Sequence, residues 1–416
     1  MQDAQKTQSV SDYLRDYSTR LKLGDLGSLP IILGLIAIAI IFQSQNSNYL
    51  TPRNMVNLIV QMAGITTIAI GVVFVLLLGE IDLSIGYVSA VAAVLAALLL
   101  LGPSDKTGVG MFLQRLGFES PWSWYVAIPV GLAFVALVGV VQGLIITRFQ
   151  LPSFVVTLAG LLVWNGVVLI LIGAGGTVII QDQVVVDIAN YFLPSGWGWA
   201  VGIAAILLFA IGRVNRWLSR RKRGVSTTPV AVVVFQILAL AGVTATVIYI
   251  CNLDRGVPVV GIIVLVLLSI FSFLAMRTRF GRYVYAIGGN MEAARRAGIN
   301  VTRIRVTVFM LSSLMAGMGG VILASRLRSV DTAAGGGNLL LISIAAPVIG
   351  GTSLFGGHGR VVSALLGALV IIGVENGMGL LGLSAGVKFV VTGLVLLAAV
   401  LVDSITRRGR AQSGIA

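Results

Sequence analysis

Long apolar stretches separated by short polar segments run along almost the whole chain. Twelve such stretches predict helices, near residues 27–43, 54–79, 83–102, 123–147, 154–173, 196–212, 229–251, 257–276, 304–324, 338–350, 360–381 and 386–402. A helix of about 20 apolar residues crosses the hydrocarbon core of a bilayer, and most of these stretches approach that length. The pattern therefore predicts an all-α polytopic membrane bundle of about 10–12 transmembrane helices.

The composition agrees with a membrane protein and disfavours several other classes. Hydrophobic residues make up 57% of the chain and charged residues 11%, against roughly a quarter charged in an ordinary soluble domain. A disordered, nucleic-acid-binding or disulfide-stapled secreted protein does not fit these values. One cysteine, Cys251, and one histidine, His358, disfavour internal disulfides and metal centres built from these residue types. The sequence also lacks a P-loop, so we expect the chain to bind no cofactor of its own.

Basic residues are distributed unevenly among the polar segments. The formal net charge is +14. If the N-terminus is cytoplasmic, most of the 29 Lys and Arg residues fall on the inner side, including the clusters at 213–223 and 277–305. The positive-inside rule therefore favours cytoplasmic N- and C-termini. This topology divides the chain into an N-terminal cytoplasmic segment at 1–26 that forms a surface helix, a transmembrane domain at 27–402, and a cytoplasmic tail at 403–416.

Two features predict irregular structure inside the bundle. The stretch at 338–350 is shorter than a full span and follows Gly335–Gly337, so it forms either a broken, re-entrant helix or a short tilted one. The segments at 79–90 and 350–364 share a glycine-containing start and a Val-Ser-Ala step. This likeness is compatible with a parallel internal repeat or with chance similarity between apolar helices. The 51 glycines predict close packing between helices.

The basic loop at 277–303 contains the most specific pattern of the chain. Asn290 is a favourable helix N-cap, Glu292 suits the first turn, and Gly298 suits the position just after the end of a helix. A short helix at 291–297 is therefore predicted, held away from the membrane by the Gly-Gly turn before it. Such a helix either docks into a soluble partner or belongs to a basic loop that rests on anionic headgroups.

Several motifs together resemble a known transporter family. They are Thr278-Arg279-Phe280-Gly281, Ala286-Ile287-Gly288-Gly289-Asn290, Glu80-Ile81-Asp82-Leu83-Ser84-Ile85-Gly86, Gly350-Gly351-Thr352-Ser353-Leu354-Phe355-Gly356-Gly357 and Asn376-Gly377-Met378. On these motifs the chain is similar, over nearly its whole length, to the ribose- and xylose-type permease subunits of bacterial ATP-binding cassette (ABC) importers. An extra stretch near 195–255 distinguishes it from the shorter ribose type and resembles the D-xylose branch.

This resemblance implies a transport permease of the bacterial inner membrane that is not an enzyme. A separate cytoplasmic ABC ATPase subunit would hydrolyse ATP, and a periplasmic sugar-binding protein would deliver a monosaccharide, D-xylose or a related pentose. A second copy of the permease would complete a homodimer surrounded by membrane lipid, and no nucleic acid would take part. The coupling residues that the resemblance implies are Gly288, Gly289, Asn290, Glu292, Ala293, Ala294, Arg296, Ala297 and Gly298.

Polar residues in or beside the predicted spans are candidates for the substrate path. They are Glu80, Asp82, Gln142, Asn165, Glu375 and Asn376. Ionisable groups inside a membrane often mark a substrate pathway, and uncharged amides suit a polyhydroxyl solute. The same side chains can instead cap a helix or bond a neighbouring one, so the residues alone leave both interpretations open.

Two other classes of function compete with the ABC permease. An ion-coupled secondary transporter of a small polar solute is the main alternative, and it requires acidic residues deep within the spans. The chain offers few beyond Glu80, Asp82 and Glu375. An intramembrane enzyme requires convergent Ser/His, His/Glu or paired Asp residues, which a chain with one histidine supplies poorly.

Overall fold

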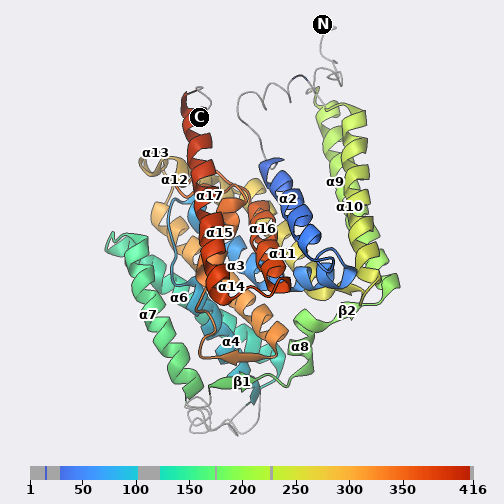
Figure 1. The fold of residues 1–416 in the computed structure, drawn as a ribbon. Helices are drawn as coiled ribbons and strands as arrows, with labels where there is room; N and C mark the ends of the chain where they lie inside the picture. Colours follow the sequence, from blue (N-terminus) through green and yellow to red (C-terminus); the bar gives the residue numbers. More distant parts are fainter. Residues whose placement is uncertain (1–14, 16–28, 102–121, 174–175, 225–227, 413–416) are drawn as a thin grey trace.

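The computed structural model describes residue 15 and residues 29–101, 122–173, 176–224 and 228–412, and in these ranges the fold is a helical bundle with four short strands (Figure 1). The bundle helices are α2 (Leu29–Gln45), α3 (Pro52–Leu77), α4 (Ile85–Leu101), α6 (Trp124–Arg148), α7 (Ser153–Ile172), α9 (Ser195–Lys222), α10 (Val230–Asn252), α11 (Val259–Arg277), α14 (Val301–Leu327), α15 (Leu339–Ile349), α16 (Val362–Leu380) and α17 (Ala385–Gln412). The shorter elements are α8 (Gln183–Asn190), α12 (Arg279–Gly289), α13 (Met291–Arg296), β1 (Thr177–Ile179), β2 (Phe192–Leu193), β3 (Val257–Pro258) and β4 (Ser329–Asp331). β1 pairs antiparallel with β4, and β2 with β3.

A helix is present at each of the twelve stretches that hydrophobicity predicts. Within the described residues, eight of these helices are long and apolar enough to cross a membrane, and α2, α4, α15 and the described apolar part of α17 are shorter. Two boundaries differ from expectation: α9 runs to Lys222 instead of 212, and α17 runs to Gln412 instead of 402. The surface helix predicted at 1–26 lies outside the described residues, apart from the single residue 15. The all-α prediction is confirmed in its coarse form, a polytopic bundle.

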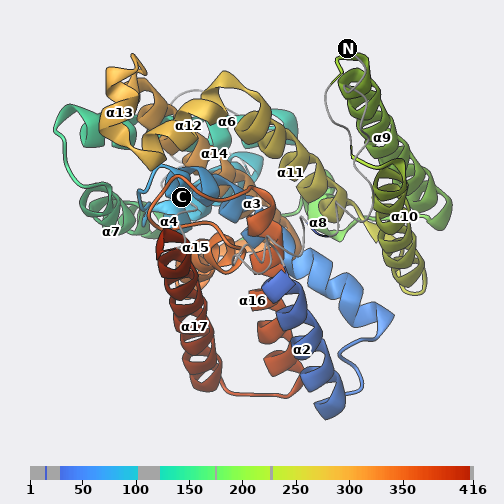
Figure 2. The same ribbon diagram turned by 90° about the horizontal axis from the view of Figure 1, so that it is seen from above.

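The helix α14 forms the centre of the bundle and packs on α3, α4 and α6 (Figure 2). Glycines make these close approaches possible. A Cβ added to Gly71 of α3 would lie 2.8 Å from the Cβ of Met315, and one added to Gly143 of α6 would lie 2.8 Å from the Cα of Val306. Because helices in lipid gain little from the hydrophobic effect, such small-residue contacts supply much of the packing energy.

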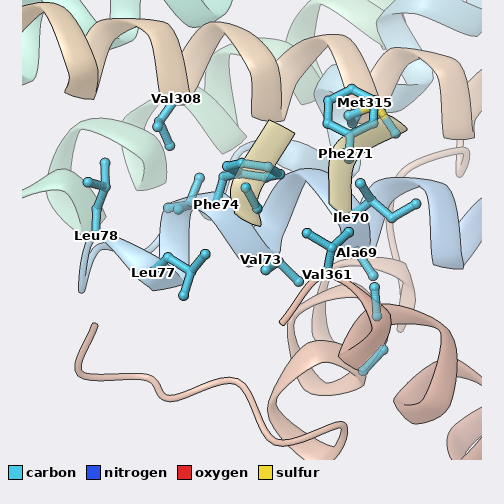
Figure 3. Close-up of a cluster of buried hydrophobic side chains, with 14 of the residues drawn as sticks. Ala69, Ile70, Val73, Phe74, Leu77, Leu78, Phe271, Val308, Met315 and Val361 are labelled. Atoms are coloured by element: carbon cyan, nitrogen blue, oxygen red, sulfur yellow. The ribbon is translucent and has the colours of Figure 1, made fainter. Parts of the chain in front are cut away.

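One apolar cluster joins the centre of the bundle to α11 and α12 (Figure 3). Phe74 of α3 is fully buried, and its ring lies 6.0 Å from that of Phe271 in an edge-on arrangement. The same ring stacks at 6.2 Å on Phe280, which belongs to the first turn of α12. The cluster therefore anchors α12 directly to α3.

Two helices of the bundle begin inside it. The Asp82 carboxylate accepts a hydrogen bond from Ser312 at 3.3 Å, and Ser312 lies eleven residues, or about 16 Å, along α14 from Val301. Residues 80–84 are therefore irregular backbone that runs into the bundle beside α14 before α4 starts at Ile85.

The helix α15 starts at the same depth. A Cβ added to Gly86, in the first turn of α4, would lie 2.5 Å from the carbonyl oxygen of Gly335. Residues 332–338 form turns, and α15 then has 11 residues, about 16 Å, which is half of a bilayer core. These features favour the broken helix over the short tilted one.

The basic segments gather at one end of the molecule. In Figure 1, α12, α13, the start of α2 and the end of α17 lie at the same end of the molecule. The C-terminal end of α9 and the start of α10 lie there too, and β1 and α8 lie at the opposite end. The predicted alternation of spans, which brings the clusters at 213–223 and 277–305 to one side, agrees with this arrangement.

Candidate functional site

The hairpin formed by α12 and α13 occupies the basic end of the bundle. The side chain of Thr278 accepts a hydrogen bond from the Gly281 amide at 3.2 Å and caps α12. The side chain of Asn290 accepts one from the Ala293 amide at 2.9 Å and caps α13, as the sequence predicts. Gly298 follows α13 with φ +81°, a conformation that favours glycine.

The outer face of α13 is small and bordered by charge. Ala293 and Ala297 are exposed, whereas Ala294 is 4% exposed and belongs to the apolar core. Of the three alanines among the predicted coupling residues, Ala293 and Ala297 therefore face outward and Ala294 faces the core. Glu292 lies 3.3 Å from Arg296 in an exposed pair, which contributes little to stability.

Gly288 and Gly289 do not form the predicted turn, because both belong to the last turn of α12. Gly288 is a site of close backbone contact, where an added Cβ would collide with the carbonyl oxygen of Leu77 at the end of α3. An added Cβ on Gly289 would meet nothing within 4 Å. The C-terminal end of α12 therefore packs against the end of α3 at a backbone distance that only glycine permits.

The loop after α15 completes this contact. The Gly357 amide donates to the Leu77 carbonyl at 2.9 Å, and a Cβ added to Gly356, at φ +87°, would lie 2.7 Å from the Gly288 carbonyl oxygen. A Cβ added to Gly79 would lie 3.1 Å from the Phe355 carbonyl oxygen. The two similar segments at 79–90 and 350–364 thus meet at the α12 end, in what we call the glycine junction (Gly79, Gly288, Gly356 and Gly357).

Tyr285 adds a polar bond to the same contact. Its hydroxyl donates to the Gly359 carbonyl oxygen at 2.8 Å. Burial raises the pKa of the Tyr285 phenol, so the hydroxyl stays protonated and able to donate at neutral pH. Together with Phe280, this bond holds α12 on the bundle.

Glu80 forms a buried ion pair with Arg305, near the start of α14. The exposed fractions of the two side chains are 7% and 16%. The second carboxylate oxygen of Glu80 is buried without a partner among the described residues. Because the Glu80 carboxylate bonds a guanidinium group of α14, the pair holds the irregular segment after α3 against that helix.

Asp82 belongs to a network of buried hydroxyl and amide groups. Its carboxylate accepts from the Ser84 hydroxyl at 2.7 Å and the Ser84 amide at 3.0 Å. The Ser84 hydroxyl also lies 3.1 Å from the Gln142 side-chain nitrogen. The helix α7 satisfies two further backbone groups of the segment, because Ser153 accepts from the Ile81 amide and Thr157 from the Leu83 amide. Irregular backbone at membrane depth is tolerated only when it is satisfied in this way.

A cavity of about 540 Å³ opens between α3, α16 and the start of α17. Its lining comprises Asn54, Asn57, Gln61, Ile65, Arg326, Asn338, Ile372, Glu375, Asn376, Gly379, Leu380, Ala385, Lys388 and Phe389. These residues come mainly from the first half of α3, the second half of α16, the end of α14 and the starts of α15 and α17. The cavity therefore lies toward the end opposite α13, and we call it the outer cavity.

Amide side chains dominate the polar wall of the outer cavity. Asn54 donates to the Asn376 side-chain oxygen at 2.7 Å, and the Asn376 amide lies 3.0 Å from the Asn54 oxygen and 3.3 Å from that of Gln61. Asn338, at the start of α15, makes no side-chain capping bond to that helix. The half-helix α15 thus begins at the wall of the cavity, where its amide dipoles favour electronegative groups.

The structure separates the six residues that the sequence singles out for the substrate path. Glu375 and Asn376 line the outer cavity, whereas Glu80 pairs with Arg305 of α14. Asp82 and Gln142 both bond Ser84. Asn165 lies elsewhere, half-buried on α7. Further cavity residues, Asn57, Asn338 and Lys388, had no sequence signal of their own because they fall at helix ends, where polar residues are ordinary.

Comparisons with known proteins agree on one family. The profile of the family described as "Branched-chain amino acid transport system / permease component" matches residues 54–400. The chain is 36% identical over 390 residues to the xylose transport system permease protein XylH of Escherichia coli K12, covering 93% of this chain and 94% of that one. It is 33% identical to XylH of Haemophilus influenzae, covering 92% and 98%. With the ribose import permease protein RbsC of Bacillus subtilis it shares 32% identity, covering 91% and 94%. No solved structure matches the chain.

The buried ion pair generates a prediction about stability. Glu80→Gln removes the carboxylate and leaves the largely buried Arg305 charge uncompensated, so the free energy of unfolding should fall by about 3–5 kcal/mol. The matched control is Glu292→Gln, which breaks an exposed pair and should change it by less than about 1 kcal/mol. Equilibrium unfolding in mixed micelles measures both. Equal small effects would show that Glu80 is not held as described.

Proposed function

The chain belongs to the permease family described as branched-chain amino acid transport system / permease component, and from that premise we propose that it translocates a pentose, D-xylose or a close relative. It is a permease component of the ABC sugar importers and a multi-pass protein of a bacterial membrane, not an enzyme. In ABC systems generally, ATP hydrolysis belongs to the partner ATPase. The xylose permeases among the relatives support the choice of a pentose.

The outer face of α13 is the docking site for the ATPase subunit in this proposal. Ala293 and Ala297 offer a shallow surface into which a complementary groove can fit, and Glu292, Arg295 and Arg296 surround it with polar contacts. Gly288, Gly289, Asn290 and Gly298 fix the shape of the hairpin, and Ala294 holds it to the core. The coupling loop at 277–303 therefore combines a surface for a partner with a firm attachment to the bundle.

The glycine junction is the observation that carries the mechanism. Because Gly288 is packed on the Leu77 carbonyl and on the loop at 350–361, a displacement of α13 is transmitted to both loops. Each loop adjoins one of the two broken helices, α4 and α15. Closure of the ATPase pair would thus move the meeting point of these helices and open the path past it. In this proposal, Glu80 and Asp82 hold the irregular segment at 80–84 in place beside the path.

The outer cavity is the site where the sugar first enters. Its volume of about 540 Å³ falls within the range of small-molecule pockets. The amides of Gln61, Asn338 and Asn376 supply both donors and acceptors for sugar hydroxyls, and Phe389 gives an apolar surface for a ring face. Glu375 and Lys388 lie at the same wall and add charge-assisted bonds.

The orientation, the binding protein and the dimer in this proposal rest on membership of the permease family. The end that carries α13 faces the cytoplasm, so the segments 1–26 and 403–416 are cytoplasmic and the permease domain spans 27–402. A periplasmic binding protein delivers sugar to the outer cavity, and two copies of the chain form the translocation unit with two ATPase subunits. The basic clusters at one end of the molecule support this orientation.

The docking proposal predicts the effect of two exposed alanines. Ala293→Trp and Ala297→Glu add bulk or charge to the contact face, so binding of the ATPase subunit should fall at least tenfold while thermal unfolding of the permease stays unchanged. Co-purification and ATP-driven xylose uptake in vesicles containing the binding protein measure the loss. The matched control is Ala231→Trp, an exposed alanine of α10 at the same end of the molecule.

Three results would contradict the docking assignment. Undiminished ATPase binding by both variants would remove α13 from the contact. An equal loss in Ala231→Trp would show that the effect is not specific to the hairpin. Uptake by the intact chain that needs an ion gradient and no ATP would favour the secondary transporter instead.

The outer cavity predicts a separate effect on the sugar. Asn338→Ala and Asn376→Ala remove hydrogen-bonding groups from its wall, so the half-saturating sugar concentration for uptake should rise about threefold to tenfold. Asn165→Ala is the matched control, since it removes an amide from α7 outside this wall, and it should leave uptake unchanged. A rise for Asn165→Ala alone would move the sugar path to α7.

A further inference from the structure

A second cavity lies between the ends of α9, α10 and α11, at the end of the molecule that carries α13. Its volume is about 560 Å³. Five arginines line it: Arg213, Arg216, Arg220, Arg223 and Arg277. Four of these come from α9 or its C-terminal cap, and Arg277 ends α11. The cavity therefore joins the α9–α10 hairpin to the segment that leads into α12.

The positive charge of this cavity has no acidic partner in the described part of the chain. No carboxylate is among its lining residues. Between residues 188 and 291 the sequence has one acidic residue, Asp254, which pairs with Arg255 beside β3 at the other end of α10. Arg213, Arg216 and Arg277 line the same cavity, so their like charges repel one another.

One guanidinium group has an unused donor inside the protein. Arg213 donates from one terminal nitrogen to the side-chain oxygen of Gln236. Its Nε is buried and has no partner among the described residues. A buried donor without an acceptor is costly, and an anion in the cavity would supply that acceptor.

Apolar surface leads away from the cavity along the helices that form it. Ile211, Val214 and Leu218 are exposed along α9, and Ile270 and Phe273 are exposed along α11. The hairpin is attached to the rest of the chain mainly at its far end, through the pairing of β2 with β3 and the contact of α10 with α3 (Figure 2). A ligand with a phosphate group and two hydrocarbon chains fits both the basic cavity and these apolar flanks.

We propose that this cavity binds the phosphate of an anionic phospholipid, such as phosphatidylglycerol. Arg213, Arg216 and Arg277 hold the phosphate, because the planar guanidinium group matches a phosphate with two parallel hydrogen bonds. The acyl chains lie on the exposed apolar faces of α9 and α11. The lipid thereby fills the contact that the protein leaves open between the added hairpin and α11. This site is independent of the sugar and of the ATPase docking face.

The test uses the purified, delipidated full chain. Binding of phosphatidylglycerol, phosphatidylethanolamine and glycerol 3-phosphate is measured by native mass spectrometry and by the shift in thermal unfolding. The triple variant Arg213→Gln, Arg216→Gln, Arg277→Gln should bind phosphatidylglycerol at least about tenfold more weakly than the unmodified chain. The matched control Arg148→Gln, Arg282→Gln, Arg303→Gln removes the same charge from exposed positions and should bind normally.

Each alternative result overturns the proposal in a distinct way. Equal phosphatidylglycerol binding by the triple variant places the lipid elsewhere. Equal binding of phosphatidylethanolamine shows that the net charge of the lipid is not recognised. Glycerol 3-phosphate binding as tight as that of the lipid makes the cavity a site for a soluble anion. If the triple variant unfolds without lipid, the single change Arg216→Gln, at an exposed side chain, gives the same comparison.

Discussion

Backbone amides and carbonyls cannot remain unpaired at membrane depth, and this constraint explains much of the polar chemistry of the bundle. The irregular segment at 80–84 needs such partners, so Ser153 and Thr157 of α7 accept from its Ile81 and Leu83 amides. Ser312 of α14 donates to the buried Asp82 side chain of the same segment. Residues 332–338 interrupt a second span and are satisfied partly by their own turns. Polar residues that resemble a substrate path by composition are therefore partly the supports of two broken helices.

The two interruptions also place the starts of two helices at the centre of the bundle. The helices α4 and α15 each start midway, and Gly86 of α4 lies against Gly335 in the turn segment that leads into α15. The loops that adjoin them converge on Gly288 at the end of α12. The α12–α13 hairpin thus contacts both loops at once. The outer cavity lies at the start of α15, toward the end of the molecule opposite α13. This geometry fits a permease that receives its energy from a separate subunit.

Local and periodic signals predicted much of the fold. Hydrophobic stretches located all twelve bundle helices, and the Asn290 cap and Gly298 located α13, because both depend on neighbouring residues alone. The direction in which Ala294 points was not predictable, since it depends on how α13 lies on the core. The role of Gly288 and the gathering of Asn54, Gln61 and Asn376 depend on contacts between distant segments, which hydropathy does not encode.

Side-specific cysteine labelling tests the central claim most directly, because Cys251 is buried and is the single native cysteine. In a Cys251→Ser background, Ala297→Cys marks the docking face of α13 and Lys388→Cys marks the outer cavity. The account predicts that an impermeant thiol reagent reaches residue 388 from the periplasmic side and residue 297 only from the cytoplasmic side, where the ATPase subunit protects it. Labelling of residue 297 from the periplasm, or of both residues from one side, would contradict it.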